Sequence, residues 1–526
     1  MMKFRPLKTI NVIQLAVVLA ILFNVGILLY FSAQTSMWDD EVNSYFLSTL
    51  PVSEMIDLMS GNFDEDAPGF NILEHGWQKI AHSNQFALRL MPFSLWLATL
   101  LGVGFLAYRL GGNPGLYWAL IITALWPYHW IYPIALRWYS LAAALGVWNL
   151  YFFVKLLDSV SGDVDYSRYR RLLFGALVAV TGAALWYTVY SAPVLAAGEL
   201  AALIFVSGWS PRKYWAWGLS WLGAVILYLP WLSTFLGQLG ESTGTRFAWS
   251  NILSSLYVLW AGDFSIPTTF WISLPLLGAF VIVGVLALRY WSVSKIPLVV
   301  SVVILLGLLL FGVVEMKRLL IVTVFLSSAV GLAVAAAMRE GPGPITRNLL
   351  ITAGVLALIG FGGSFANMVS GTGWITYRWL DKINEAASYI NSEHQDALIL
   401  TNSNALAFYA NDSIGIELAK YQGAIQLGSE SKTKVWNTLL RTDPTYQPKM
   451  LEAISSSTEI VYAHHAFFTS AGSTGEMESV VRWLESMSFD SFVERQFTPI
   501  ENGIEQFLDF PDHPGYRMTL IYLKKK

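Results

Sequence analysis

The sequence predicts a polytopic α-helical membrane protein with about 11 transmembrane helices and a C-terminal extracytoplasmic α/β domain. Of the 526 residues, 55% are hydrophobic and only 13% are charged, whereas an ordinary soluble domain carries about 25% charged residues. Charged residues are sparse through residue 370 and return to an ordinary frequency in the rest of the chain. Long apolar runs followed by a polar tail exclude an ordinary cytosolic protein.

Eleven apolar runs are long enough to cross a bilayer, for which about 18–20 residues are needed. The first run is longer than a signal-peptide core and is followed by no small-x-small cleavage pattern, so we expect an uncleaved anchor. Residues 251–262 could form a further short or interfacial helix, which would change the side on which the tail lies. The predicted spans are at about 10–32, 87–108, 115–133, 138–157, 172–190, 192–209, 214–236, 269–290, 296–314, 319–338 and 348–369.

The distribution of Lys and Arg predicts a cytoplasmic N-terminus. With that orientation, 14 basic residues fall in inner segments and six in outer ones, as the positive-inside rule requires. An odd number of spans then places the C-terminal domain outside. The six outer residues are Lys79, Arg89, Arg137, Arg246, Lys317 and Arg318.

Several function classes are excluded or disfavoured by composition. The chain has no cysteine, so disulfides, thiolate metal sites and thiol nucleophiles are absent. The formal net charge of −3 gives no basic excess that would indicate nucleic acid. No Gly-rich phosphate loop of the nucleotide-binding type is present, which argues against an ATP-driven pump.

The first outer loop, residues 33–86, is rich in acids. Asp39, Asp40 and Glu41 are consecutive and follow the first span at the edge of the bilayer. Carboxylates in this position can act as a general base toward an acceptor or bind a divalent cation. Asp66, in a second acidic turn, could add another carboxylate at the same edge. The alternative interpretation of both clusters is a solvated loop without chemistry.

Basic residues at the outer ends of two later spans are the second unusual feature. Arg137 opens the fourth span, and Lys317 and Arg318 open the tenth. A cation near the hydrocarbon costs roughly 2–3 kcal/mol on insertion scales, so a negative partner is expected: an acid of the first loop, a lipid head group or the phosphate of a bound lipid. Arg suits phosphate because its planar fork donates two parallel bonds. The alternative is snorkelling toward membrane lipids.

The tail, residues 371–526, alternates helix-like and strand-like patterns and is expected to form an α/β domain separate from the membrane domain, residues 1–370. The segments that carry the pattern are Trp374–Ser392, Ala397–Thr401, Ile460–Ala463, Met477–Met487 and Met518–Leu523.

Four short motifs resemble, in their order and expected membrane depth, those of GT-C fold glycosyltransferases. The group is that of protein O-mannosyltransferases and lipid A aminoarabinose transferases, including the bacterial dolichyl-phosphate-mannose-protein mannosyltransferase-like family. The chain departs from the group's His-Pro-Pro-Leu-like turn, because an aspartate stands where the group has His. The matching residues are Asp40-Glu41 with Tyr45, Pro68 with Asp66 in the place of His, Arg137 with Tyr139, and Arg318.

The resemblance implies a GT-C glycosyltransferase that moves a sugar from a polyprenyl-phosphate-linked donor to a lipid, glycan or protein acceptor, with inversion. Asp40 would be the general base, with Asp39 as the alternative, and Glu41 and Asp66 would orient the acceptor, tune the base or bind a divalent cation. The donor phosphate would be held by Arg137, Arg318, Lys317 and Tyr139.

The resemblance also implies a bacterial inner (plasma) membrane location, with the C-terminal domain periplasmic or extracellular. The sugar, the acceptor, the metal requirement, the oligomeric state and the role of the tail stay open. A competing class is a lipid or glycan transporter or flippase with an outer accessory domain. Transporters place charged sites near the midplane, but here the spans are nearly free of acids, with Glu199 as the exception. A third class, a receptor or assembly scaffold, would not need arginines at span ends.

Overall fold

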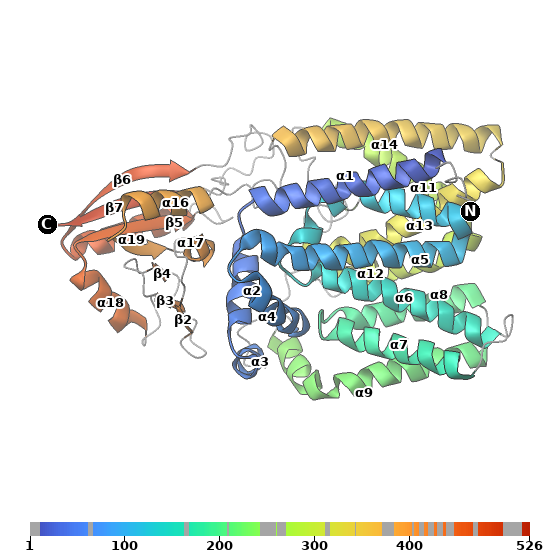
Figure 1. Ribbon diagram of the computed structural model, residues 1–526, viewed down its shortest axis with the longest axis horizontal. Coiled ribbons are helices and arrows are strands. Elements are labelled where there is room, and N and C mark those ends of the chain that lie inside the picture. The colour runs from blue at the N-terminus through green and yellow to red at the C-terminus, as the bar shows by residue number, and fades with distance from the viewer. Residues whose placement is uncertain are drawn as a thin grey trace, which may run out of the picture.

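The computed structural model of the chain describes most of its length and shows a helical bundle with a polar domain at one end (Figure 1). The described residues are 11–60, 67–161, 168–207, 210–241, 259, 270–310, 316–341, 343–370, 383–401, 404–409, 415–418, 425–428, 435–437, 446–465, 472–497 and 518–526.

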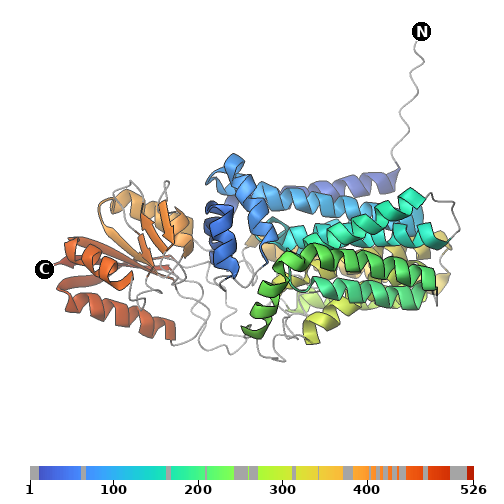
Figure 2. The same ribbon diagram turned by 90° about the horizontal axis from the view of Figure 1, so that it is seen from below.

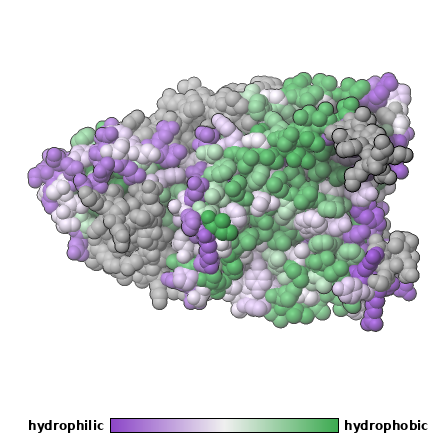
Figure 3. Space-filling model, in the orientation of Figure 1, coloured by the Kyte–Doolittle hydropathy of each residue, from purple (hydrophilic) through white to green (hydrophobic). Residues whose placement is uncertain are grey.

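Each of the eleven predicted spans falls on a helix of the bundle. Seven described helices are long and apolar enough to cross a membrane, and two further apolar helices are shorter. On the face seen in Figure 3, hydrophobic residues cover much of the bundle, with polar residues toward both of its ends. The chain is therefore a multi-pass membrane protein. The bundle helices are α1 (Val12–Gln34), α5 (Gln85–Leu125), α6 (Tyr139–Ser161), α7 (Arg168–Trp186), α8 (Ala192–Ser207), α9 (Pro211–Glu241), α11 (Phe270–Arg289), α12 (Trp291–Leu310), α13 (Leu320–Arg339) and α14 (Pro344–Ser370).

Helix α5 contains two of the predicted spans, which meet at a reversal of the chain. Gly112 has a φ of 65°, a left-handed conformation that only glycine adopts readily. Beyond it the chain packs back on itself so closely that a Cβ on Gly115 would lie 2.7 Å from the Ala107 carbonyl oxygen. The second half of α5 ends at Leu125, whereas the predicted span continues to residue 133. Pro127 and Pro133 follow Leu125 and interrupt the helical hydrogen bonding. Two short helices follow, η1 (Pro127–Trp130) and η2 (Tyr132–Ile134).

The described part of the loop after α1, which the sequence predicts to be the first outer loop, is helical and lies across one end of the bundle. Its described helices are α2 (Asp39–Thr49), α3 (Val52–Ser60) and α4 (Gly69–Ala81). They lie between the bundle and the C-terminal domain, while α1 begins at the far end of the bundle (Figures 1 and 2). Because successive spans reverse direction, α6 and α13 both begin at the end of the bundle that carries α2. We call the end of the bundle that carries α2 the loop end.

The C-terminal domain is a seven-stranded mixed sheet with helices against it. The strand order is β2-β3-β4-β1-β5-β7-β6, in which β4, β1 and β5 are parallel and the outer strands are antiparallel. The five predicted segments correspond to α16, β1, β5, α19 and β7, whereas six further elements were not predicted, and the boundary at residue 370 stays a prediction. The described elements are α16 (Ile383–Glu393), β1 (Leu398–Thr401), α17 (Asn404–Tyr409), β2 (Gly415–Leu418), β3 (Ile425–Gly428), β4 (Val435–Asn437), α18 (Tyr446–Ser456), β5 (Glu459–His465), α19 (Gly472–Ser486), β6 (Phe489–Phe497) and β7 (Met518–Lys525).

Candidate active site

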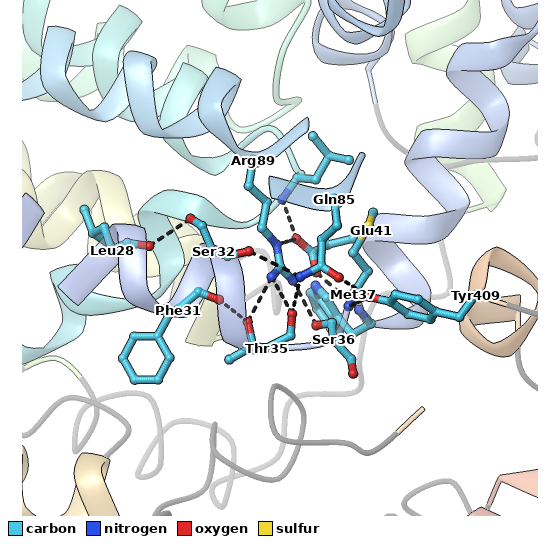
Figure 4. A network of polar contacts seen from close by, with 12 residues as sticks. Leu28, Phe31, Ser32, Thr35, Ser36, Met37, Glu41, Gln85, Arg89 and Tyr409 are labelled. Atoms are coloured by element: carbon cyan, nitrogen blue, oxygen red, sulfur yellow. Dashed lines mark hydrogen bonds and ion pairs between the residues drawn. The ribbon is translucent and has the colours of Figure 1, made fainter. Parts of the chain in front are cut away.

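The start of α2 is held by a fully buried ion pair between Glu41 and Arg89 (Figure 4). Both side chains are 0% exposed, and Arg89 Nη2 lies 2.7 Å from Glu41 Oε2 while Arg89 Nε lies 3.1 Å from Oε1. Two backbone amides also donate to the carboxylate: that of Trp38 at 3.2 Å and that of Leu136 at 2.8 Å. Glu41 thus ties α2 to α5 and to the segment before α6.

The remaining donors of Arg89 hold the end of α1. Its Nη1 donates to the carbonyl and hydroxyl oxygens of Thr35 at 2.8 and 2.9 Å, and Nη2 donates to the carbonyl oxygen of Ser36 at 2.9 Å. The pair is therefore well compensated for the cost of burying two charges, which such pairs repay only when further hydrogen bonds satisfy them. Its visible role is to fix the geometry of the loop end.

The C-terminal domain closes this network. The Tyr409 hydroxyl of α17 accepts a hydrogen bond from the Met37 amide and donates to Gln85 Oε1, each at 2.5 Å. Gln85 in turn donates to carbonyl oxygens at the end of α1, and beside it the Phe408 ring packs edge-on against Tyr45, with centroids 5.0 Å apart. Helix α17 is thus docked on α2.

Arg137 and Asp40 are brought together at the loop end, as the sequence predicts. Arg137 is 8% exposed, and its Nη1 donates to the Ser44 hydroxyl at 2.7 Å and to the Asp40 carbonyl oxygen at 3.2 Å. The Asp40 side chain is half-buried in the first turn of α2, where the helix dipole favours a negative charge. Arg137 therefore contacts the backbone of Asp40 at the start of α2.

The structure describes the positions of only some of the other predicted site residues. Arg318 lies half-buried in η3 (Met316–Leu319), directly before α13 at the loop end. Tyr139 is the first residue of α6 and is 1% exposed, with its ring edge-on to Trp138 at 4.7 Å between centroids. Asp66 and the side chains of Asp39 and Lys317 lie outside the described residues, so their predicted roles stay predictions.

Glu74 on α4 was missed by the sequence reasoning. It is 0% exposed and accepts from the Ser48 hydroxyl at 3.1 Å and from Gln78 Nε2 at 3.5 Å. Burial raises the pKa of its carboxyl to about 8, an effect that Arg137 partly opposes. The signal was its position one helical turn after Phe70, on the buried face of an amphipathic helix, where an acid is unusual.

The start of α4 explains why the chain departs from a Pro-Pro turn after position 67. The Gly69 amide donates to the Tyr187 carbonyl oxygen at 2.6 Å, which a proline could not do. A Cβ at this position would also lie 2.6 Å from the same oxygen. Gly69 thus permits the contact that anchors α4 to the end of α7.

A divalent-cation site is not evident in the described part of the chain, where no group of three or more His, Asp or Glu side chains could hold a metal ion. Asp66, one of the acids predicted to bind a cation, lies outside that part, so the cation stays a prediction.

Comparison with solved structures identifies the fold of the chain. The chain superposes on ArnT from Cupriavidus metallidurans, a lipid A aminoarabinose transferase, in the apo state with a TM-score of 0.56 and bound to undecaprenyl phosphate with a TM-score of 0.55. In both cases the match has 11% identity and covers 96% of this chain and 97% of that chain. The chain has the GT-C fold. The predicted resemblance is thereby confirmed for the fold.

A weaker likeness is to the oligosaccharyltransferase of Archaeoglobus fulgidus in its apo form, with a TM-score of 0.46 and 11% identity over 93% of this chain and 74% of that chain. No protein-family model matches the chain, and no curated protein matches its sequence.

Proposed function

We propose that this GT-C protein is a membrane glycosyltransferase that uses a polyprenyl-phosphate-linked sugar as donor. The observation that carries the proposal is the meeting of Asp40 and Arg137 at the loop end, where Arg137 donates to the Asp40 carbonyl oxygen. A donor with a polyprenyl tail stays in the bilayer, so its phosphate would be met at the membrane edge. The undecaprenyl phosphate in the ArnT crystal structure supports a donor of this kind.

The chemistry follows from the two groups. Arg137, assisted by Arg318 and Lys317, would bind the phosphate and stabilise the charge that it gains as the glycosidic bond breaks. Asp40 would take the proton of the acceptor's attacking group, so that the new bond forms opposite the leaving phosphate and the anomeric centre inverts. Asp66 and Tyr139 would line the acceptor and donor sides, respectively.

We further propose that the protein lies in a bacterial inner membrane with its N-terminus cytoplasmic, which would put the loop end and the C-terminal domain on the outer face. The Arg109 and Asp158 ion pair lies at the other end of the bundle, where Arg109 precedes the reversal at Gly112. The excess of basic residues at that end supports a cytoplasmic assignment for it. The acceptor would be a lipid, a glycan or a protein of the cell envelope.

The test is transfer of a radiolabelled sugar from polyprenyl phosphate in membranes that contain the protein. Asp40→Asn should lower the rate by about 10²–10⁴-fold while the protein stays inserted and folded. Asp57→Asn is the matched control, because it makes the same change at an exposed position of α3. Full activity of Asp40→Asn would move the base elsewhere, first to Asp39. Movement of lipid across the bilayer without any sugar transfer would instead favour a flippase.

A further inference from the structure

Five basic residues lie in the first turns of two neighbouring bundle helices, α7 and α9. Arg168, Arg170 and Arg171 belong to α7, and Arg212 and Lys213 belong to α9. All of them except Lys213, which is half-buried, are exposed. Among the described residues, no ion pair with an acid is found for Arg168, Arg212 or Lys213. We call these five residues the basic cluster.

The basic cluster lies at the end of the bundle opposite the loop end. Just after α7, the Tyr187 carbonyl oxygen accepts from the Gly69 amide of α4. Near the end of α9, Gln238 Nε2 donates to the Met59 carbonyl oxygen of α3 at 2.8 Å. Because both helices end against the helices of the loop end, both begin at the opposite edge of the membrane domain.

The two helix starts are side by side because α7 and α9 pack closely (Figures 1 and 2). A Cβ on Gly175 would lie 3.2 Å from Ser220 Oγ, and a Cβ on Gly223 would lie 3.1 Å from the Ala179 Cβ. The residue numbers rise together in these two contacts, so the helices run in the same direction and the first turns lie at one level. The axes of packed helices are about 8–10 Å apart, so the basic groups of both helices border one groove.

The positive charge of this region exceeds that of its acids. Residues 162–215 contain the five bases of the cluster and three acids. One of the acids, Glu199, is fully buried in α8. The other two, Asp163 and Asp165, lie outside the described residues, and counting both of them still leaves an excess of three bases at this edge. The positive ends of two helix dipoles add to the same field.

The surface next to the cluster has the character of a lipid contact. Tyr169 and Trp215 are 74% and 70% exposed, and Leu172 and Leu219, farther along the same helices, are 64% and 60% exposed. Aromatic side chains favour the level of the lipid head groups, and leucines deeper in the membrane meet acyl chains. The order of basic, aromatic and aliphatic side chains therefore matches a phospholipid whose head group lies at the basic cluster.

We propose that the starts of α7 and α9 bind an anionic phospholipid with two phosphodiester groups, of the cardiolipin class, with one phosphate at the basic residues of each helix. Basic pockets between membrane helices suit head groups of this kind, and a lipid with a single phosphate would engage one helix only. The site lies at the opposite end of the bundle from Asp40 and Arg137, so the inference is independent of the proposed function.

The experiment measures lipid binding to the purified full-length protein in neutral detergent by native mass spectrometry. Cardiolipin, phosphatidylglycerol and phosphatidylcholine are added separately. One cardiolipin should bind saturably, about tenfold or more tightly than phosphatidylglycerol, because its two phosphates are linked. Phosphatidylcholine should not saturate. Equal affinities for cardiolipin and phosphatidylglycerol would overturn the inference.

One substitution on each helix tests the position of the site. Arg168→Gln and Arg212→Gln should each weaken cardiolipin binding by about fivefold, and the double variant should lose most of the preference for cardiolipin over phosphatidylglycerol. Arg347→Gln is the matched control, because it removes an exposed base at the start of α14, on the other side of the bundle from α7 and α9 (Figure 1). Its affinity should equal that of the wild type. Equal losses in all three single variants would show a diffuse attraction and overturn the inference.

A measurement on the wild type alone covers the case in which the variants do not fold. Screening weakens attraction between exposed charges, so the affinity for cardiolipin should fall several-fold between about 0.05 M and about 0.5 M ammonium acetate. An affinity that does not change with salt would show that acyl-chain contacts alone hold the lipid, and would reject the basic cluster as its binding site.

Discussion

Two neighbouring acids on α2 meet two arginines in very different ways. Glu41 and Arg89 are both 0% exposed, and each is surrounded by protein donors or acceptors. Asp40 is half-buried, and its partner Arg137 contacts its backbone carbonyl oxygen and the Ser44 hydroxyl. The first pair is enclosed by protein and holds the loop end together, whereas the second is the pair that we propose meets the ligand. Charge of the same kind at adjacent positions therefore serves structure in one case and, we propose, chemistry in the other.

The largest expected effect is on the structural pair. Arg89→Ala leaves Glu41 buried without its cation, which typically costs about 3–5 kcal/mol, so we expect little folded protein after purification. Arg109→Ala is the control, because it breaks an ion pair whose side chains are 42% and 20% exposed and should cost less than about 1 kcal/mol. Heating each variant and measuring the remaining folded protein by size-exclusion chromatography gives the stability of both variants. Equal stability of the two variants would show that the buried Glu41–Arg89 pair contributes no more to stability than the exposed Arg109–Asp158 pair.

Measurements of stability and of sugar transfer should distinguish the roles of Glu41 and Asp40. Glu41→Gln weakens the contact with Arg89 and should lower the thermal unfolding temperature by several degrees, with a loss of activity in proportion to the folded protein lost. Asp40→Asn should leave the unfolding temperature unchanged and abolish most of the sugar transfer per folded molecule. An Asp40→Asn variant as unstable as Glu41→Gln would mean that both acids are structural.

The arginines of the proposed donor site should affect binding more than folding. Arg137→Gln and Arg318→Ala should raise the donor KM by about tenfold or more, since a charged hydrogen bond to phosphate typically contributes about 1.5–3 kcal/mol. Steady-state kinetics at varied donor concentration measure this. An Arg318→Ala enzyme with an unchanged donor KM would count against a phosphate role for that residue.

The smallest expected effect concerns the contact from the C-terminal domain. Tyr409→Phe removes the hydroxyl that joins Met37 and Gln85 and should cost about 1 kcal/mol. Because this contact lies beside the Glu41–Arg89 pair, we expect a few-fold lower kcat with the donor KM unchanged. Phe408→Ala, which removes the packing on Tyr45, should have a similar effect. Wild-type kcat in both variants would show that docking of α17 does not influence the site.

Much of the architecture was predictable because hydropathy acts over short stretches of chain. A run of about 20 apolar residues must span the bilayer whatever surrounds it, so each predicted span corresponds to a helix. The alternating pattern of the tail likewise placed β1, β5 and β7. Errors arose at the edges of elements, such as the early end of α5 at Leu125, where prolines decide the boundary.

The site was only partly predictable. The approach of Asp40 to Arg137 was expected, because both follow or precede a span at the same end of the bundle. The partner of Glu41, the burial of Glu74 and the docking of Tyr409 could not be predicted, since Arg89 lies 48 residues from Glu41 and Tyr409 lies 372 residues from Met37. The sequence by itself determined which segments enter the membrane and which charges stay at its edge. Only the tertiary structure decided how those charges pair, because pairing depends on the packing of helices and not on local hydropathy.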